Sequence, residues 1–403
     1  MQLKSSIALV ILLINLVVIL LWPQDHEQEQ EVRQLEEQTH VAGDEIVLRF
    51  REIPSGATLF IRGGHGSTLL FPEEKDNKIQ FTLPPVYAQK KGQLSYDLIA
   101  SDKVVMSGKI SIKPNENNVE RMEAYLGPSS ITAGGGDFTQ LVAMPVDNYD
   151  NTLFDGTPVT VRTQFKGQEN SISLSTAHGF VHQDIFSPLE DGKLLVSAVS
   201  NGTSSTGMIT KVYPHLATGF SIFAERPHKY ADGDQITLLK TSIIKDRYGN
   251  IVSDGTQVEF MIQDSDSTLY RAVGSTINGM ATTQVNHPRA ATTLTIKAGI
   301  SGIAESAPLV VDYLAAVNNF EYRLRERTLT VGPVHAFMGQ RIPQGTPIHL
   351  KLQGANGEYV VTKYADDGMA TFVLPVEQVA AGTWEINIMV LGKVQSKMIN
   401  IAE

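Results

Sequence analysis

Apolar and polar residues alternate in short runs along nearly the whole chain after residue 40. Examples are Thr58-Leu59-Phe60-Ile61, Val258-Glu259-Phe260-Met261 and Ile386-Asn387-Ile388-Met389. A period of two residues is typical of strands that bury one face. Clusters of Gly, Asn, Asp and Pro separate the runs, and no long segment with a helical period of 3.6 follows residue 40. The pattern predicts an all-β protein, and short strands at regular spacing favour β-sandwiches.

A continuous apolar segment near the N-terminus breaks this pattern. Residues 7–22 are interrupted only by Asn15, and as a helix they would span about 24 Å. Lys4 precedes the segment and many Glu residues follow it, so the positive-inside rule leaves the N-terminus in the cytoplasm. Residues 22–26 lack the small residues that a signal-peptidase site needs. We therefore predict an uncleaved signal anchor that crosses the membrane with residues 5–22, in preference to a cleaved signal peptide.

The next segment, residues 24–40, is rich in Glu and Gln and has almost no apolar residues. Because it has no apolar stripe, nothing forces it to pack against a core. We predict an acidic juxtamembrane spacer. The predicted location is the inner (cytoplasmic) membrane, crossed once, with the C-terminal part periplasmic or extracellular.

Internal repetition divides the part after residue 40 into similar units. Asp147-Asn148-Tyr149-Asp150-Asn151 recurs about 100 residues later as Asp246-Arg247-Tyr248-Gly249-Asn250, and Asp-Gly-Thr follows both copies. A fainter pair is Ile53-Pro54-Ser55-Gly56 and Ile342-Pro343-Gln344-Gly345. The repeats predict a tandem array of four Ig-like β-sandwiches.

The predicted boundaries follow from these repeats. They are residues 1–23 for the anchor, 24–40 for the spacer, and 41–113, 116–213, 214–313 and 314–403 for the four modules. The joints between modules are short, so we expect a semi-rigid rod rather than a flexible string of domains.

The repeated block has the composition of a tight turn. Asp and Asn side chains bond to nearby backbone groups, and Gly supplies a left-handed conformation. Asp150 stands where the later copy has Gly249, and Asp tolerates that conformation. The Tyr can bury its ring while its hydroxyl reaches a backbone acceptor. The predicted structural turn residues are Asp147, Tyr149, Asn151, Gly156, Asp246, Tyr248, Gly249, Asn250 and Gly255.

This block resembles the bacterial immunoglobulin-like repeat of the invasin and intimin adhesins. In that family Asp-x-Tyr-Gly-Asn is followed by Gly-x-x-Val and later by Thr-x-x-x-Gly-x-Ala. Residues 214–313 carry the pattern most fully, ending in Thr276 and Gly279-Met280-Ala281, and residues 116–213 carry a degenerate copy. The resemblance implies Ig-like sandwiches in a rod that holds or forms a binding surface. It does not extend to the lectin-like tip of those adhesins, so it does not imply adhesion to host cells.

Composition removes several functional classes. The chain has no Cys, which excludes disulfides, thiolate zinc sites and cysteine nucleophiles. Its net charge of −10 argues against a nucleic-acid partner. No Gly-x-Ser-x-Gly, His-Glu-x-x-His, P-loop or EF-hand motif is present. The glycine-rich Arg62-Gly63-Gly64-His65-Gly66 lies between strand patterns and predicts a hairpin loop. We therefore expect no enzyme activity, no cofactor and no small-molecule ligand.

Other polar groups have two interpretations each. His178 and His182 fit a surface loop better than a metal site. The acidic turns Asp232-Gly233-Asp234, Asp264-Ser265-Asp266 and Asp366-Asp367-Gly368 could hold Ca²⁺ between modules, although turn formation alone explains them. Trp384 stands where the first module has Leu94, which indicates a core position.

A row of arginines is the candidate binding face. Arg323, Arg325 and Arg327 alternate and would share one strand face. Such a face could contact an anionic polymer or an acidic partner. A charged sheet edge that blocks edge-to-edge pairing is the preferred interpretation.

The sequence as a whole predicts a non-enzymatic, membrane-anchored envelope protein. Its rod of Ig-like modules would contact other envelope or surface proteins or act as a scaffold. An adhesin-like or glycan-binding surface protein and a periplasmic part of a secretion or conjugation apparatus are the alternatives.

Overall fold

The computed structural model describes residues 33–34, 38–50, 53–54, 56–75, 78–115, 119–355 and 357–402. The predicted anchor and most of the predicted spacer lie outside these residues. The described part of the spacer belongs to a sheet, since Arg33–Gln34 and Gln38–Val41 pair in parallel with Lys103–Lys113, so the prediction that residues 24–40 do not pack is wrong there. None of the described segments forms a helix with the length and apolar composition needed to cross a lipid bilayer.

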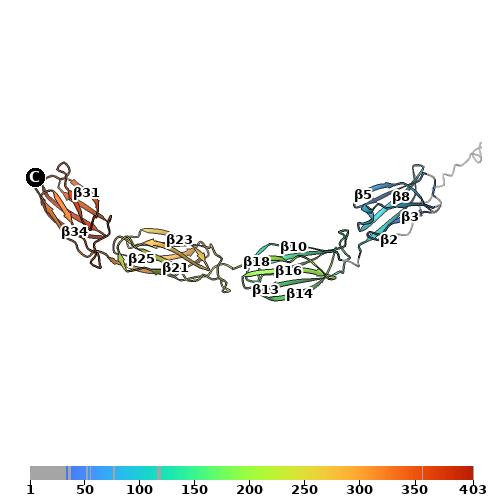
Figure 1. The fold of residues 1–403 in the computed structure, drawn as a ribbon, viewed down its shortest axis with the longest axis horizontal. Helices are drawn as coiled ribbons and strands as arrows, with labels where there is room; N and C mark the ends of the chain where they lie inside the picture. The colour runs from blue at the N-terminus through green and yellow to red at the C-terminus, as the bar shows by residue number, and fades with distance from the viewer. Residues whose placement is uncertain are drawn as a thin grey trace, which may run out of the picture.

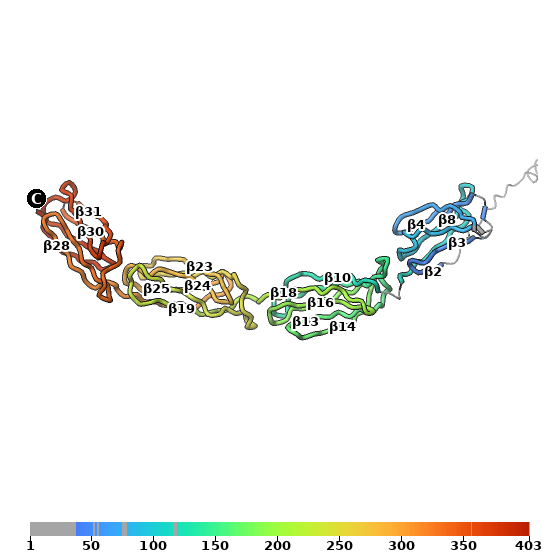
Figure 2. The backbone as a smooth tube through the Cα atoms, viewed as in Figure 1, coloured from blue at the N-terminus to red at the C-terminus, as the bar shows by residue number. Residues whose placement is uncertain are grey.

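The described chain is nearly all β, as the alternating pattern predicts. Its one helix is the short α2 (Pro85–Ala88). The strands form four groups that lie one after another in a gently curved row (Figure 1). We call these groups the first module (β1 to β9), the second (β10 to β18), the third (β19 to β27) and the fourth (β28 to β34). The tube drawing shows the same four groups in chain order (Figure 2).

The first module has two facing sheets. One has the order β1-β9-β8-β4-β5, with β2 also paired to β9, and the other has the order β3-β7-β6. The strands are β1 Arg33–Gln34, β2 Gln38–Val41, β3 Val47–Arg49, β4 Thr58–Gly63, β5 Gly66–Leu70, β6 Glu73–Lys75, β7 Lys78–Thr82, β8 Gly92–Ala100 and β9 Lys103–Lys113. Gly63 pairs with Gly66 across the turn between β4 and β5, so the predicted hairpin is confirmed.

The second module repeats this plan. Its sheets have the orders β10-β12-β15 and β11-β18-β16-β13-β14, with β17 paired to β16. The strands are β10 Arg121–Gly127, β11 Ser130–Thr132, β12 Phe138–Val146, β13 Pro158–Phe165, β14 Gln168–Ser175, β15 Val181–Phe186, β16 Gly192–Ser200, β17 Thr203–Ser204 and β18 Met208–Tyr213.

The third module joins its strands in one path, β19-β21-β24-β23-β22-β25-β27-β20, with β26 paired to β25. The strands are β19 Ile222–Glu225, β20 Tyr230–Ala231, β21 Ile236–Thr241, β22 Gln257–Gln263, β23 Leu269–Ile277, β24 Met280–Asn286, β25 Thr292–Ile300, β26 Ala304–Glu305 and β27 Leu309–Ala315.

The fourth module has the sheets β28-β29-β32 and β31-β30-β33-β34. The strands are β28 Tyr322–Arg325, β29 Thr328–Val331, β30 Pro347–Gly354, β31 Gly357–Tyr364, β32 Ala370–Val373, β33 Gly382–Val390 and β34 Lys393–Ile401.

Each module has its own cluster of buried apolar residues, and the strand alternation supplies it. In β22 the inward side chains Val258, Phe260 and Ile262 are buried while their neighbours face outward. Trp384 lies in the fourth cluster, 5% exposed, and Leu94 lies in the first. The predicted core position of Trp384 is therefore confirmed.

The opening segment of the second and third modules pairs in two separate places. In the third, β19 pairs antiparallel with β21, and β20 then crosses to pair in parallel with the last strand, β27. In the second, β10 and β11 pair in the same way with β12 and β18. This crossover extends β27 to Leu314 and Ala315, so the boundary predicted at residue 313 falls inside a strand. The sequence pattern missed this because the pairing partner, Tyr230, lies more than eighty residues earlier.

Candidate functional site: the joints between modules

The repeated Asp-x-Tyr-Gly-Asn block folds into a loop around its buried aspartate. In the third module, Asp246 Oδ1 accepts hydrogen bonds from the backbone nitrogens of Tyr248 (2.8 Å) and Asn250 (2.9 Å). Its Oδ2 accepts from Asn250 Nδ2 and from the backbone nitrogen of His215, both at 2.8 Å. Four donors therefore hold a carboxylate that is 4% exposed.

The second module builds the same loop. Asp147 Oδ1 accepts from the backbone nitrogens of Tyr149 and Asn151, both at 2.9 Å. Its Oδ2 accepts from Asn151 Nδ2 (3.0 Å) and from the backbone nitrogen of Asn115 (3.1 Å). Asp150 has φ +64° where Gly249 has φ +90°, so the predicted left-handed position is confirmed in both copies.

Hydrogen bonding keeps both carboxylates ionised. Burial alone would raise the pKa of Asp147, but the donors from Asn151, Asn115 and Tyr149 outweigh it and hold the pKa below its usual value. Burial opposes the donors from Asn250, His215 and Tyr248 at Asp246 in the same way, and its pKa is also lowered. The loops are therefore complete at neutral pH.

The asparagine of each block bonds to the preceding module. Asn250 Nδ2 donates to the carbonyl oxygen of Leu189 (2.8 Å), and Asn250 Oδ1 accepts from the backbone nitrogen of Asp191 (3.0 Å). Leu189 and Asp191 lie in the loop before β16, which we call the exit loop of the second module (residues 189–191). The amide thus bonds to the residues on either side of Glu190, as a backbone residue does to its neighbour in a parallel ladder.

The same bridge occurs one joint earlier. Asn151 Nδ2 donates to the carbonyl oxygen of Gln89 (2.8 Å), and Asn151 Oδ1 accepts from the backbone nitrogen of Lys91 (2.9 Å). Residues 89–91 form the exit loop of the first module. Asparagine is suited to this position because its side chain offers both a donor and an acceptor, whereas aspartate offers only acceptors when ionised.

The tyrosine of each block also faces the preceding module. Tyr248 Oη donates to the carbonyl oxygen of Gly134 (3.3 Å), so the predicted backbone acceptor exists but lies in the second module. A Cβ at Gly134 would come within 2.9 Å of the Tyr248 ring. Tyr149 packs against Gly43 in the same way, since a Cβ there would overlap its ring. Small residues in one module therefore admit the aromatic ring of the next.

The third joint keeps the loop and changes its side chains. Ala336 N donates to Gln340 O and Gly339 N donates to Ala336 O, both at 2.8 Å, as Asp246 and Gly249 do in the third module. The sequence correctly shows no Asp-x-Tyr-Gly-Asn block in residues 314–403, yet the backbone loop is present. Ala336 stands in place of the aspartate, so the carboxylate cap is missing here.

Aromatic packing takes the place of the asparagine bridge at this joint. Phe337 stacks on Tyr230 of the third module, with ring centres 3.9 Å apart and planes 11° apart. It also lies 4.7 Å from the ring of His228. The joint therefore depends on ring contacts beside a group of histidines.

The arginine row does not share one face. Arg323 and Arg325 alternate on β28 and are exposed, as predicted. Arg327 lies instead in the turn after β28, because the chain reverses at Glu326, which has φ +50°. Its guanidinium donates to the carbonyl oxygens of Leu374 (3.1 Å) and Ala402 (2.9 Å) and also to that of Val379. Arg327 thus stabilises the fourth module, and the shared face predicted for three arginines is wrong.

The acidic turns use their carboxylates locally. Asp264 Oδ1 accepts from the backbone nitrogens of Asp266 (3.0 Å) and Thr268 (2.8 Å), which is turn formation. Asp367, with φ +50°, pairs with Arg341. Asp232 differs, because its carboxylate faces two histidines.

The two histidines of the second module lie apart in structure. His178 is in a turn with φ +56°, but His182 lies on β15 with its side chain exposed. The surface loop predicted for both is correct only for His178. The left-handed glycines Gly156 and Gly255, with φ +89° and +83°, stand at the turns the sequence predicts.

The sequence predicts neither asparagine bridge, because the block by itself indicates only a local turn. Its recurrence with the same Asn in both copies is the one sequence signal that could have indicated a shared external contact. The exit loops carry no matching motif, since Gln89 and Leu189 contribute only backbone atoms.

No protein-family model and no curated protein sequence matches this chain. Solved structures that resemble it include InvD of Yersinia pseudotuberculosis, which is 14% identical, with 85% of this chain and 98% of that chain covered and a TM-score of 0.37. The Escherichia coli adhesin FdeC is 14% identical, with 71% and 98% covered and a TM-score of 0.34. A tetra-tandem repeat from the extending region of a large adhesion protein is 11% identical, with 86% and 91% covered and a TM-score of 0.33. These structural neighbours are bacterial adhesin repeat proteins, the type that the Asp-x-Tyr-Gly-Asn block indicates.

Proposed function

We propose that this protein is a non-enzymatic stalk of four Ig-like modules that presents a surface to other envelope or surface proteins. Residues 5–22 would anchor it in the inner membrane, and the acidic residues that follow, up to the strand that begins at Arg33, would hold the modules away from the lipid. The division into four modules is part of this proposal, with the predicted bounds 41–113, 116–213, 214–313 and 314–403 changed where β1 and β2 join the first module and β27 continues to Ala315. A surface or adhesion role is the broad class to which such a stalk belongs.

The observation that carries the proposal is the repeated asparagine bridge. Asn151 and Asn250 each make two hydrogen bonds to an exit loop of the module before them. A flexible tether would need no such contacts, because a chain that only connects domains gains nothing from fixing their orientation. Paired directional bonds at successive joints support a rod with fixed angles.

Glycan binding receives no support from Trp384, the one tryptophan after residue 22. Trp384 would be the natural stacking platform for a sugar ring, but it is buried, and its Nε1 donates to Ala380 O at 2.8 Å. Enzyme activity is likewise not part of the proposal, since the joints use their polar groups for structural hydrogen bonds.

Topology can be tested with single cysteines, because the natural chain has none. Lys397→Cys, exposed on β34, should react in cells with a membrane-impermeant maleimide once the outer permeability barrier is opened. Gln2→Cys, on the other side of the predicted anchor, should react only after the cells are lysed. Reaction of both variants in unlysed cells, or release of a soluble chain that begins after residue 22, would contradict the anchored stalk.

Partner binding can be tested by cross-linking from the same Lys397→Cys position in intact membranes. The stalk proposal predicts cross-links to a small set of envelope proteins. A control cysteine at Ser171, exposed in the second module, should give fewer of them if the distal part carries the contact surface.

A further inference from the structure

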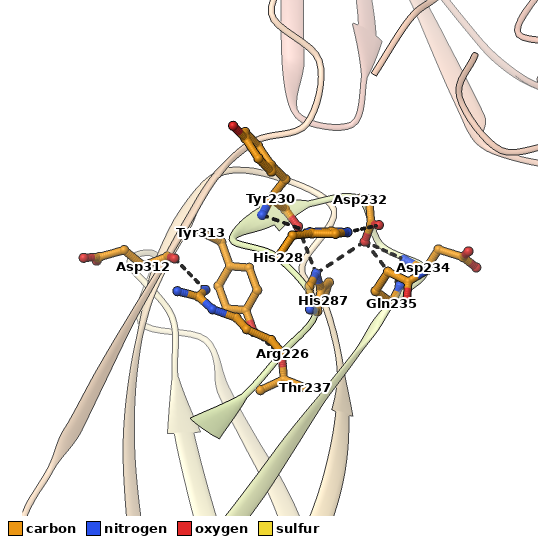
Figure 3. Close-up of polar contacts among 10 residues, drawn as sticks. All are labelled: Arg226, His228, Tyr230, Asp232, Asp234, Gln235, Thr237, His287, Asp312 and Tyr313. Carbon is orange, nitrogen blue, oxygen red and sulfur yellow. Dashed lines mark hydrogen bonds and ion pairs between the residues drawn. The ribbon is translucent and has the colours of Figure 1, made fainter. Parts of the chain in front are cut away.

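Three side chains suited to a metal ion converge at the end of the third module that faces the fourth (Figure 3). His228 precedes β20, Asp232 follows it, and His287 follows β24. Asp232 Oδ2 lies 3.3 Å from His228 Nε2, and Asp232 Oδ1 lies 3.5 Å from His287 Nδ1. One ligand atom from each of the three lies within 4.8 Å of the others.

Two of these separations are close to those around a tetrahedral ion, and the widest, up to 4.8 Å, would close by about 1.4 Å when the ion binds. With metal–ligand bonds of about 2.0–2.1 Å, neighbouring ligands of a tetrahedral zinc site lie about 3.3–3.4 Å apart. Two imidazoles and one carboxylate form a donor set that zinc accepts, with a fourth position for water. Calcium takes oxygen ligands only, so the calcium interpretation of the turn at Asp232 does not fit this geometry.

The surrounding bonds hold the three groups in place. Asp232 Oδ1 also accepts from the backbone nitrogens of Asp234 and Gln235, each at 3.2 Å. His228 Nδ1 accepts from the backbone nitrogen of Tyr230 at 3.2 Å. Fixed ligands lose little freedom when an ion binds, which favours affinity.

His287 is the deepest of the three groups. Its side chain is fully buried and packs edge-on against Tyr313, with ring centres 5.0 Å apart. Its Nδ1 is the ring nitrogen that faces the Asp232 carboxylate, so His287 is placed to coordinate an ion through that atom.

Binding would exchange weak contacts for metal bonds. His287 Nδ1 now lies 2.9 Å from Tyr230 O, and its Nε2 is buried without a hydrogen-bond partner among the described residues. Coordination through Nδ1 moves the ring proton to Nε2, so the ring stays neutral. At His228 the contact of 3.3 Å to Asp232 is replaced, and the ring proton moves from Nε2 to Nδ1, which gives up the hydrogen bond from the backbone nitrogen of Tyr230.

The group touches the joint that lacks an asparagine bridge. His228 contacts Phe337 of the fourth module, and Tyr230, two residues later, stacks on the same ring. An ion that ties His228 and Asp232 to His287 would fix the segment that carries these ring contacts. It would therefore stiffen the third joint, where Ala336 leaves the carboxylate cap missing.

We propose that His228, Asp232 and His287 bind one zinc ion and that this ion fixes the angle between the third and fourth modules. The binding site stands on its own geometry. Its effect on the angle rests on the proposed stalk function.

Cobalt(II) is the probe for the binding step, because its visible absorption reports the number and geometry of its ligands. The full chain, in detergent micelles and without a histidine tag, should bind one Co²⁺ with the strong visible bands of four-coordinate cobalt. One equivalent of Zn²⁺ should remove these bands. Absence of the bands, or bands of six-coordinate intensity, would overturn the site.

Two ligand variants and two matched controls define the residues. His228→Ala and Asp232→Asn should each weaken binding by at least about 100-fold, since changes to residues that merely support ligands already cost 10–100-fold. His182→Ala and Asp264→Asn, a histidine and a turn aspartate outside the group, should leave binding unchanged. Both ligand positions are only partly buried, and an unchanged unfolding profile will show that these variants fold. Wild-type affinity in both would overturn the assignment.

The effect on the joint needs a separate measurement. Spin labels at Lys297→Cys in the third module and Lys397→Cys in the fourth report the width of the distance distribution across the third joint. Zinc should narrow this distribution in the wild-type background and not in His228→Ala, and it should not change labels at Ser171→Cys and Lys297→Cys across the second joint. If zinc binds but the distance distribution does not narrow, the proposed effect on the joint is wrong and the binding site remains. Failure of the anchored topology would appear only in the maleimide experiment.

Discussion

Replacing Asn250 with alanine tests whether the modules are held at fixed angles. The side chain is 6% exposed and makes two hydrogen bonds across the second joint, to Leu189 O and from Asp191 N. It makes a third bond within its own loop, to Asp246 Oδ2. Alanine removes all three bonds and adds no atoms that could strain the joint.

The expected size follows from the two bonds across the joint. Each hydrogen bond contributes about 0.5–1.5 kcal/mol net, so the pair contributes about 2 kcal/mol to the docked state. Because about 1.4 kcal/mol corresponds to a factor of ten, the ratio of docked to undocked joints should fall by about 30-fold. Loss of the bond to Asp246 also loosens the loop and adds to this effect.

The assay is the distance distribution between spin labels at Ser171→Cys and Lys297→Cys, both exposed and on either side of the joint. In the Asn250→Ala background the distribution should broaden markedly, while the fold of each module stays intact by circular dichroism. Asn170→Ala, an exposed asparagine on β14, is the matched control and should leave the width unchanged.

A second substitution sharpens the test. Asn250→Asp keeps the acceptor for Asp191 N but places a carboxylate 2.8 Å from Asp246 Oδ2, where a donor stood. Like charges at that distance repel, so Asp should broaden the distribution more than Ala at neutral pH and recover in acid. If neither variant broadens the distribution, the asparagine bridge does not fix the joint and the reasoning fails.

Three further outcomes are expected. Arg327→Ala should destabilise the fourth module by about 2 kcal/mol or more, because bonds from a charged donor to three carbonyls are lost. Urea unfolding followed by Trp384 fluorescence in a Trp22→Phe background measures this loss of stability, and an unchanged midpoint would refute the stabilising role of Arg327. Because the pKa values of Asp147 and Asp246 are lowered by folding, their contribution to stability is complete above the unfolded-state pKa of about 3.9 and is lost as the pH falls through the folded-state pKa. The first two joints should therefore loosen only below about pH 4, and small-angle scattering curves that change near pH 6 would contradict this prediction. Because the pKa of His287 is lowered by folding, the unfolded chain takes up a proton on this ring at a higher pH than the folded chain does. The third module should therefore lose stability as the pH falls below about 6.5. Calorimetry that shows no such loss would exclude a buried neutral ring.

Local patterns in the sequence determined the fold class and the position of the turns. Alternation along β22 gave strands because it depends only on neighbouring residues, and the left-handed positions at Gly249 and Asp150 followed from backbone sterics. The core position of Trp384 followed from its match to Leu94 in a repeat. Each of these properties depends on a few neighbouring residues or on the alignment of one sequence repeat with another.

Only the tertiary structure decided what the turns contact. Asn250 and Leu189 are 61 residues apart, and Asn151 and Gln89 are 62 residues apart, so no local pattern links them. The arginine row failed for a related reason, since the turn at Glu326 moves Arg327 off its strand. Alternation describes a strand that continues, and it cannot show where the strand ends.

The histidine group shows the same division between sequence and structure. The sequence places His228 four residues before Asp232, and the fold brings His287 to them because it follows β24, the strand that pairs with β21. Propensity and periodicity are properties of short segments, so the sequence by itself determined which elements form. Which side chains meet between modules depends on how those elements are placed in space, and that placement exists only once each core has packed.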